Sequence, residues 1–318
     1  MLDIKFIREN SELVQKATKD KGYEVDINHV LEIDAKYREL SQSVQKMREE
    51  RNIIAKEKNV EKGRELKDKL EKEEHALKAV EEELTRWLYK IPNIPLEDVP
   101  VGKDESENVE LRKWGKPKQF DFKVKDHIEL GETLGIIDIE HASKVSGTRF
   151  AYLKNEAALL EFALIQYAFS VLTNENILKT LANKVKKDYT AKPFVPVVPP
   201  VMIHPEIFRK MARIDPEEER YYLPKDDLFL IGSAEHTLGS MHMDEVIDEK
   251  NLPLRYVGFS TSFRRESGTY GKDTRGILRV HHFDKIEMES FTSAENSLKE
   301  QDFFVAIQEY LVQALEIP

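Results

Sequence analysis

Cysteine is absent from the 318 residues of this chain, and its absence excludes several kinds of chemistry. Without a thiol there can be no disulfide, no zinc-thiolate site and no cysteine nucleophile. Long apolar runs are also missing, because no stretch of ~18 apolar residues is present to cross a bilayer. The first residues, Met1-Leu2-Asp3-Ile4-Lys5, do not resemble a signal peptide. We therefore expect a cytoplasmic protein that makes no use of a membrane.

Positive charge is scarce over the whole chain, which has 49 Lys and Arg against 59 Asp and Glu and a net charge of −10. This balance excludes a general affinity for nucleic acid, so any RNA contact requires a local basic surface. Hydrophobic residues make up 40% of the sequence, enough for a sizeable core, and the length allows two domains. Charged residues make up 34%, which indicates a long solvated element.

Proline is absent between Asn28 and Tyr89, and glycine occurs there once, at Gly63. Large or apolar residues recur in this stretch in steps of three and four, as in helices that wind around each other. The two seams are Ile33, Tyr37, Leu40, Val44, Met47, Ile54 and Leu66, Leu70, Leu77, Val80, Leu84, Trp87. With a turn at residues 58–63, they predict an antiparallel helical hairpin. Two helices of a compact bundle are the alternative, although one narrow stripe per helix cannot build a wide core.

The far end of this predicted hairpin carries nine basic and six acidic residues between Lys46 and Leu70. A local excess of positive charge suits contacts with phosphates, which supply affinity without reading a base sequence. A solvated helical face with internal ion pairs explains the same charges. The candidate residues for contacts with nucleic-acid phosphates are Lys46, Arg48, Arg51, Lys56, Lys58, Lys62 and Arg64.

Prolines follow the hairpin and divide the chain into domains, because Ile91-Pro92-Asn93-Ile94-Pro95 has the composition of a linker. We expect a helical arm at residues 1–91, with a short helix from Leu2 to Gly22 packed at its base. A linker and the start of the core follow at residues 92–124, and a second domain at 125–318. Strand and helix patterns alternate irregularly in this second domain, which predicts an α+β fold.

Residues 256–291 read as two β-rich segments around a glycine-bearing loop at 267–276. Because alternate residues of a strand face one way, one sheet surface is expected to collect charged and aromatic side chains. These are Arg264, Glu266, Arg279, Phe283 and Glu287. Arginine binds phosphate oxygens in pairs, an aromatic ring stacks on a base, and a carboxylate binds an ammonium group. The set fits a site for an amino acid and a nucleoside triphosphate; an ordinary amphipathic hairpin with paired surface charges is the alternative.

This segment resembles motif 2 of the class II aminoacyl-tRNA synthetases, and its sequence is similar to that of the seryl-tRNA synthetases. The matching runs are Phe263-Arg264-Arg265-Glu266, Gly271-Lys272-Asp273-Thr274-Arg275-Gly276, Arg279-Val280-His281 and Phe283 to Glu287. The likeness covers most of the chain, including the hairpin. It implies a class II antiparallel-sheet catalytic domain behind a coiled-coil arm that grips the long variable arm of a tRNA.

By this resemblance, the activity is the ATP-dependent ligation of L-serine to tRNA(Ser), with tRNA(Sec) as a further acceptor, through a seryl-adenylate and with Mg²⁺ on the phosphates. The residues implied in catalysis are Arg264, Glu266 and Arg279. Those implied in ATP binding are Arg264, Arg265, Glu266, Val280 and Phe283. Those implied in serine binding are Ser233, Ala234, Glu235, Arg264 and Glu287. We assign no protein ligand to a metal, because the histidines lack zinc spacing.

Two further segments resemble parts of the family. Leu230-Ile231-Gly232-Ser233-Ala234-Glu235 resembles the serine-specificity loop, with Ser233 in place of the usual threonine; taken alone, it reads as a helix cap. A helix at residues 155–172 and a strand at 194–200 resemble motif 1, which implies a homodimer, whereas an edge strand that tolerates proline is the alternative. The sequence of residues 211–222 departs from the one usual in the family, and we expect local structural variation there.

The family continues to a third motif, which the resemblance does not find here, since the chain ends at Pro318 after an apolar helix at residues 303–315. We therefore expect either a fragment truncated before motif 3 or a naturally short relative, and in both cases the 318 residues alone should form no seryl-adenylate at a useful rate. A non-catalytic synthetase-like RNA-binding module and a coiled-coil structural protein are alternatives, but both leave the charged pocket unexplained. An amino-acid ligase acting on a carrier protein is a third alternative, and the long arm argues against it.

Overall fold

The computed structural model describes residues 2–57, 59–266 and 276–318. These residues form two compact units, Met1–Arg112 and Lys113–Pro318. The division at residue 112 falls inside the stretch from 92 to 124 that the sequence analysis assigns to the linker. The exact domain limits remain a prediction.

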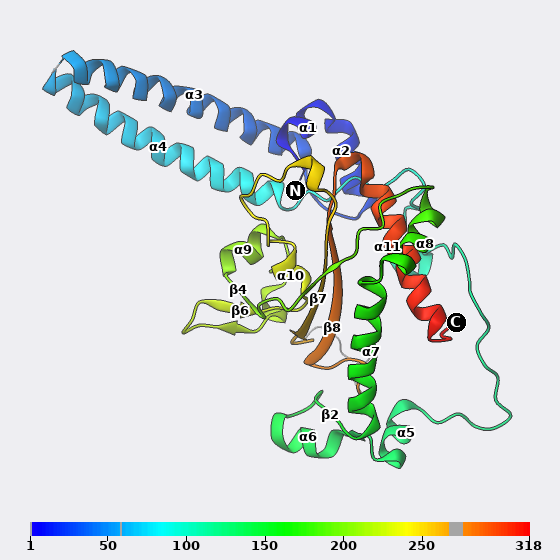
Figure 1. Ribbon diagram of the computed structural model, residues 1–318. Helices are drawn as coiled ribbons and strands as arrows, with labels where there is room; N and C mark the ends of the chain where they lie inside the picture. The colour runs from blue at the N-terminus through cyan, green and yellow to red at the C-terminus, as the bar shows by residue number, and fades with distance from the viewer. Residues whose placement is uncertain (1, 58, 267–275) are drawn as a thin grey trace. The chain divides into compact units, whose positions relative to one another are not determined.

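The first unit is built around a long helical hairpin (Figure 1). Its elements are α1 (Ile4–Glu9), α2 (Ser11–Asp20), α3 (Ile27–Glu57), α4 (Val60–Leu88) and the 3₁₀ turn η1 (Glu105–Glu107). Each predicted seam contributes buried residues between α3 and α4, such as Val44 and Leu70. Others, such as Tyr37 and Leu77, are half-buried. The antiparallel helical hairpin predicted from the heptads is therefore confirmed.

The turn of the hairpin is shorter than the sequence predicts. Residues 58–63 are expected to form it, whereas α4 already begins at Val60, so Gly63 lies inside the helix. The reason is the cap: the side chain of Asn59 accepts a hydrogen bond from the backbone N–H of Lys62 at 3.2 Å. An asparagine at this position satisfies an N–H group that the first helical turn would leave without a partner.

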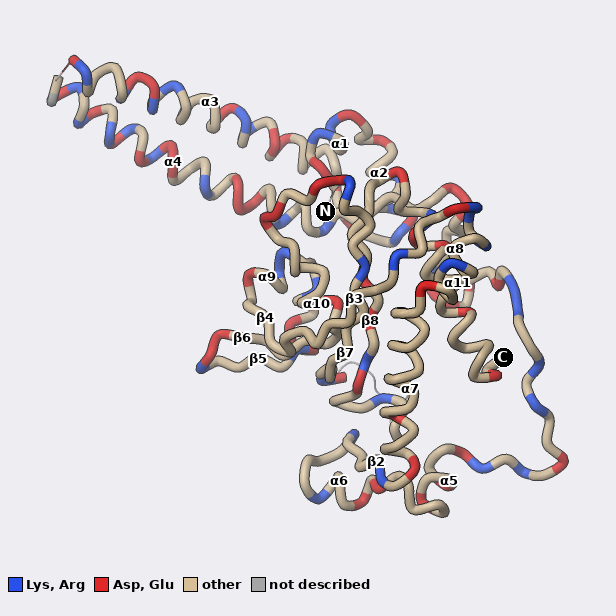
Figure 2. Tube along the Cα trace, viewed as in Figure 1, with Lys and Arg blue, Asp and Glu red and all other residues tan. Residues whose placement is uncertain are grey.

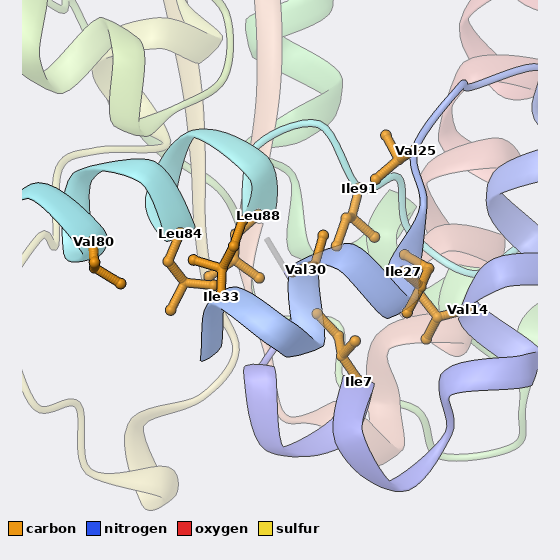
Figure 3. Close-up of a cluster of buried hydrophobic side chains, with 10 residues drawn as sticks. All are labelled: Ile7, Val14, Val25, Ile27, Val30, Ile33, Val80, Leu84, Leu88 and Ile91. Carbon is orange, nitrogen blue, oxygen red and sulfur yellow. The ribbon is translucent and has the colours of Figure 1, made fainter. Parts of the chain in front are cut away.

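Two helices, α1 and α2, pack at the base of the hairpin where the sequence predicts a single short helix. The chain breaks at Asn10, whose backbone is not helical (φ −134°, ψ 39°). Figure 3 shows the apolar cluster that holds this base together. Its buried members are Ile7, Val14, Val25, Ile27, Val30, Ile33, Val80, Leu84, Leu88 and Ile91. Packing at the base was expected correctly, and the single helix was wrong.

The second unit mixes short helices with two small sheets and a two-stranded ribbon. Its first half consists of α5 (His127–Leu134), β1 (Ile137–Asp138), α6 (Ile139–Ser146), β2 (Tyr152–Leu153), α7 (Glu156–Leu172), α8 (Glu175–Val185), β3 (Val195–Val197), β4 (Met202–Ile203) and α9 (Pro205–Lys210). Its second half consists of η2 (Glu217–Glu219), β5 (Tyr222–Leu223), β6 (Leu228–Leu230), α10 (Glu235–Leu238), η3 (Glu249–Asn251), β7 (Leu254–Phe263), β8 (His282–Phe291), η4 (Ala294–Asn296) and α11 (Ser297–Ala314).

The strands β7 and β8 form the centre of this unit, as the sequence predicts for residues 256–291. They pair antiparallel over ten residues, from Leu254↔Phe291 to Phe263↔His282. β3 lies on the other side of β7 and runs parallel to it, so the sheet order is β3-β7-β8. β3 contains Pro196 and has no second neighbour among the described strands, the position at which a sheet tolerates proline.

One face of this sheet carries the core of the second unit. Residues of α8 and α11 pack on Val257 of β7, and Phe303 and Ile307 of α11 are fully buried there. The same core encloses an ion pair between Arg255 and Glu300, at 2.5 Å between Nε and Oε1. The other face of the sheet is therefore left to polar residues, and these build the site described below.

The small sheet β4-β6-β5 has its own apolar cluster and leads into the loop at residues 231–234.

Within the part of the chain that the structure describes, no single helix is long and apolar enough to span a membrane. α7 and α8 meet that criterion of length and composition only when taken together, across a bend of 66°.

Candidate active site

Residues opposite each other across β7 and β8 share one face of the sheet, and this register collects the polar ones on one side. The pairs on that side are Ser262↔Phe283, Ser260↔Lys285, Gly258↔Glu287 and Tyr256↔Glu289. On the other side, Ile286 and Met288 pack against the core. The expectation that Phe283 and Glu287 share a face is confirmed, because both lie on β8 four residues apart.

Glu287 meets the predicted serine loop directly. The hydroxyl of Ser233 donates a hydrogen bond to Glu287 Oε2 at 2.6 Å. Lys285 Nζ lies 2.9 Å from the same hydroxyl and 2.5 Å from Glu287 Oε2. A hydroxyl, a carboxylate and an ammonium group thus form a triangle at the wall of a pocket. Lys285 was not among the predicted site residues, although its spacing from Phe283 and Glu287 on the strand was a usable signal.

Backbone contacts bring the serine loop to the end of β7. The N–H of Phe263 donates to the carbonyl of Ile231 at 2.8 Å, and Arg264 Nε donates to the carbonyl of Gly232 at 3.1 Å. Gly258 lets α10 approach the strand, because a Cβ there would lie 2.5 Å from a side-chain carbon of Leu238. Two segments thirty residues apart in the sequence therefore meet in one site.

The hydroxyl of Ser233 makes contacts both within its loop and across the site. Its oxygen accepts a hydrogen bond from the N–H of Glu235 at 3.2 Å. This is a local turn contact, because the cap residue of α10 is Ala234, whose methyl side chain makes no capping hydrogen bond. The same hydroxyl also bonds Glu287 in the pocket. Ala234, between them, is fully buried. The carboxylate of Glu235 is held by Arg213, whose Nε and Nη2 lie 2.9 and 2.8 Å from one oxygen.

The predicted motif 2 residues meet in pairs. The guanidinium carbon of Arg264 lies 5.1 Å from the centre of the Phe283 ring, which is a cation–π contact. Arg279 Nη1 lies 3.0 Å from Glu266 Oε2. Each pair joins one residue that follows β7 with one from β8 or from just before it. The structure thus brings these four residues into contact as two separate pairs.

Strand alternation does not explain this arrangement, and that part of the sequence argument was wrong. Arg264, Glu266 and Arg279 all lie beyond the ends of β7 and β8. Glu266 has a left-handed backbone (φ 50°), which strand residues do not adopt. The guanidinium of Arg149, which the sequence analysis missed, donates a hydrogen bond to the Glu266 carbonyl. Side-chain and backbone contacts made outside the sheet therefore place these residues.

The remaining predicted ATP residues lie less centrally. Arg265 is exposed, and its guanidinium carbon lies 5.2 Å from the centre of the Tyr221 ring. Val280 is half-buried just before β8. The predicted loop at residues 267–276 falls outside the described residues except for Gly276.

A cavity of about 320 Å³ lies between the serine loop and the residues that follow β7. Predicted and unpredicted residues share its walls, and four of them are cations. The lining residues are Arg213, Pro216, Glu219, Arg220, Gly232, Ser233, Glu235, His236, Arg264, Glu266 and Lys285. The residues that the sequence analysis missed come mostly from the segment 211–222, for which no motif was recognised.

Burial and neighbouring charge shift the pKa values of two groups at this site. Burial first, and then the cations Arg220 and Arg213, lower the pKa of His236 to about 3, so this imidazole is neutral. Its Nδ1 accepts the N–H of Gly232 at 3.2 Å, which leaves the proton on Nε2. Burial, with the nearby carboxylates of Glu235 and Glu287, raises the pKa of Glu289 to about 7. Cations and carboxylates therefore lie close together at this site, as the Arg213–Glu235 and Lys285–Glu287 pairs show.

Among the described residues, no group of three or more His, Asp or Glu side chains converges as metal ligands do. Glu266 is paired with Arg279, and Glu287 with Lys285. A Mg²⁺ ion bound here would accordingly be carried by a nucleotide's phosphates, with few protein ligands, which is the common arrangement for this ion.

The basic residues predicted at the tip of the hairpin lie on its surface. Figure 2 shows Lys and Arg interspersed with Asp and Glu along α3 and α4. Arg48 bonds Glu74 of the opposite helix at 2.8 Å, so part of this charge is paired, as the alternative explanation requires. Lys58 falls outside the described residues. The other candidates, Lys46, Arg51, Lys56, Lys62 and Arg64, are exposed, as is Arg48.

Family comparison agrees with the site and with the fold of the second unit. Residues 219–313 match the family model described as the tRNA synthetase class II core domain (G, H, P, S and T). Together with the antiparallel β7–β8 pair and its arginines, this match makes the second unit a class II aminoacyl-tRNA synthetase domain.

The first unit narrows the class to one family. Residues 1–95 match the seryl-tRNA synthetase N-terminal domain. The chain is 40% identical over 322 residues to a serine–tRNA ligase of Dehalococcoides mccartyi and 37% identical over 331 residues to one of Rubrobacter xylanophilus. Each alignment covers 100% of this chain and 74% of the relative. The chain belongs to the seryl-tRNA synthetase family.

Solved structures show the same relationship. The seryl-tRNA synthetase of Pyrococcus horikoshii, solved in complex with ATP, has a TM-score of 0.83 and 34% identity, covering 99% of this chain and 75% of that one. The cytoplasmic serine–tRNA ligase of Naegleria fowleri, solved with AMP, has a TM-score of 0.80 and 29% identity, covering 99% and 72%. The predicted fold class, a helical arm followed by a class II domain, is confirmed.

Proposed function

We propose that this protein activates L-serine with ATP and transfers the seryl group to tRNA(Ser), with tRNA(Sec) as a further acceptor. One observation carries the proposal: the Ser233–Glu287–Lys285 triangle and the Arg264–Phe283 pair occur together around the same pocket. The triangle offers partners for a hydroxyl and an ammonium group. The Arg264–Phe283 pair offers a cation and an aromatic plane for a nucleotide. A serine–tRNA ligase needs a site for serine and a site for ATP, and family membership supports this combination.

Serine would be held where Glu287 meets the loop at residues 231–234. Glu287 binds the substrate ammonium in competition with Lys285, while Ser233, Ala234 and Glu235 surround the hydroxyl. A buried pocket that hydrogen-bonds a hydroxyl rejects a substrate without one, because the pocket's polar groups would then stay unpaired. The paired carboxylate of Glu287, 2.6 Å from a hydroxyl donor, supports this assignment.

ATP would lie against the residues that follow β7 and precede β8. Arg264 holds the α-phosphate and the serine carboxylate near each other, and Phe283 and Val280 line the adenine. Glu266 binds near the adenine, and Arg279 and Arg265 lie toward the phosphates. A Mg²⁺ ion carried by the phosphates would neutralise part of their charge.

The reaction needs no covalent enzyme intermediate. An oxygen of the serine carboxylate forms a bond to the α-phosphorus, and the bond from that phosphorus to the bridging oxygen of pyrophosphate breaks. Arg264 stabilises the charge on the α-phosphate as the bonds change, so positioning and charge neutralisation supply the catalysis. The tRNA's terminal hydroxyl then attacks the seryl carbonyl and releases AMP.

The arm and the motif 1 region supply the proposed macromolecular contacts. Exposed lysines and arginines at the tip of α3–α4 bind tRNA phosphates. On α7, Leu159, Leu160 and Phe162 are 69%, 59% and 65% exposed, an apolar surface that a second copy would cover in a homodimer. A cytoplasmic location fits this function and remains a prediction.

The test is binding of a stable seryl-adenylate analogue, 5′-O-(L-seryl-sulfamoyl)adenosine, measured by calorimetry. We expect binding to be at least about tenfold tighter than for the alanyl analogue, since the hydroxyl is lost. Glu287→Gln should weaken binding by a similar factor, while the exposed Glu295→Gln leaves it unchanged. Equal affinity for both analogues would contradict the proposal. Binding of tRNA without the analogue would favour the RNA-binding module, and binding of the analogue without tRNA the carrier-protein ligase.

A further inference from the structure

Arg220 is a cation of the pocket to which the proposed function assigns no role. It lies between η2 and β5, in the segment whose sequence departs from the family's usual wording. Its Nε is buried and has no hydrogen-bond partner in the part of the chain that the structure describes. Its guanidinium carbon lies 5.6 Å from the centre of the ring of Phe208, which is fully buried. A buried donor without an acceptor is costly, and a bound ligand can supply the acceptor.

The surroundings of Arg220 disfavour the positive charge of its guanidinium overall. Burial first, and then the charge of Arg264, lower the pKa of Arg220, and Arg213 adds to the effect. The carboxylates of Glu219 and Asp215 raise that pKa, but the net direction is still downward. Three guanidinium groups close together with incomplete compensation favour the binding of an anion.

The backbone fixes Arg220 relative to the rest of the site. The N–H of Arg265 donates to the carbonyl of Glu219 at 3.1 Å, so the residue before Arg220 is tied to the residue after Arg264. On the opposite side, Gly232 allows a close approach, because a Cβ there would lie 3.2 Å from Arg220 Nη1. The guanidinium is therefore held between the serine loop and Arg264, on the wall of the same cavity.

We propose that Arg220 is an additional substrate-binding residue, whose guanidinium joins Arg264 in binding an oxyanion of the substrates. The inference rests on the proposed function. The anion is either the carboxylate of serine or a phosphate group of ATP, both of which suit a planar guanidinium fork. The segment at residues 211–222 thereby contributes to substrate recognition and is more than a connection between α9 and β5.

Calorimetric titration of Arg220→Gln tests this and identifies the anion. If the carboxylate is bound, affinity for serine falls roughly 10- to 100-fold while affinity for L-serinamide is unchanged. If a phosphate is bound, affinity for ATP falls by that factor while affinity for adenosine is unchanged. Arg209→Gln is the matched control, because this arginine is exposed at the end of α9 in the same part of the chain. It should change neither affinity.

Two milder variants keep the inference testable should Arg220→Gln not fold. Arg220→Lys keeps the charge but loses the fork, and Gly232→Ala keeps Arg220 but crowds its Nη1. Both variants should weaken binding of the ligand that Arg220→Gln affects, and both should leave the circular dichroism spectrum unchanged. Affinities for serine and ATP within twofold of the unmodified protein in both variants would overturn the inference and leave the proposed function intact. An unmodified protein that binds neither serine nor ATP would overturn both.

Discussion

The chain contains two antiparallel hairpins of opposite character, one of helices (α3–α4) and one of strands (β7–β8). In the helical hairpin, apolar residues such as Val44 and Leu70 are enclosed between the helices, and most charges are exposed. The exception is Asp34 of α3, which is buried and paired with Arg8 and Arg38. In the strand pair, one face joins the core, and the other holds charged groups such as Lys285 and Glu287 in a half-buried pocket. The same residue types are therefore used in two different environments.

This difference shows where a charge carries information about function. An exposed charge on the helical hairpin keeps its water and has little effect on folding, so many arrangements serve equally well. In the pocket each charge loses water and must find a partner, which is why Glu287 meets both Ser233 and Lys285. Partly buried charges without a full set of partners, such as Arg220, are then the best pointers to a ligand.

The largest expected effect separates buried charge from exposed charge. In the unmodified protein the side chains of Arg255 and Glu300 are at most 5% exposed. Glu300→Gln therefore leaves Arg255 buried without its counter-charge. We expect a loss of about 3–5 kcal/mol in the free energy of unfolding of the second unit. Urea denaturation with hydrogen exchange at the β7 amides measures it. Glu295→Gln, an exposed glutamate nearby, should stay within about 0.5 kcal/mol, and equal effects from the two variants would contradict the comparison.

The charges of the helical hairpin should matter for RNA instead. Replacing Lys56, Lys62 and Arg64 by Gln is expected to weaken tRNA binding about 100-fold at low salt and to reduce the slope of log K against log salt by about 2–3. Filter binding across a salt series measures both. A control that replaces Lys5, Lys19 and Lys21 changes the net charge equally at the base of the hairpin. The assignment of the arm to tRNA fails if tip and base variants behave alike.

A pH-dependent effect should distinguish the pocket from the arm. The pKa of Glu289 is about 7 in the folded protein, against an ordinary value of 4.5. Its contribution to stability is therefore complete below pH 4.5 and is lost as pH rises through 7. Glu289→Gln, which cannot ionise, should raise Tm by a few degrees at pH 8 and leave it nearly unchanged at pH 4. Differential scanning calorimetry checks this, with the exposed Glu39→Gln of the arm as the control; a shift independent of pH would contradict the expectation.

The smallest expected effect is at the exposed pair of the helical hairpin. Arg48 and Glu74 are bonded at 2.8 Å, but their side chains are 50% and 39% exposed. Glu74→Gln should cost less than about 1 kcal/mol, and the cost should vanish in high salt. Thermal unfolding at low and high ionic strength measures it. A cost as large as that of Glu300→Gln would remove the distinction between the two hairpins.

Much of the helical hairpin could be predicted from the sequence because its contacts repeat locally. A heptad seam specifies helix, face and partner at once, so Val44 and Leu70 were placed correctly. Its turn was predicted less well, since the cap by Asn59 replaced the break expected at Gly63. The strand pair and the shared face of Phe283 and Glu287 followed equally from alternation along a strand.

The heptad pattern and strand alternation were sufficient, on sequence alone, for the two hairpins and for the shared face of Phe283 and Glu287. Tertiary structure alone decided how these segments meet. Strand periodicity ends with the strand, so Arg264 and Glu266 were placed by contacts with Gly232, Arg149 and Arg279. Arg220 was invisible for the same reason: no repeating pattern marks a residue whose role comes from neighbours distant in the chain. Local interactions leave a period in the sequence, and long-range packing around a pocket does not.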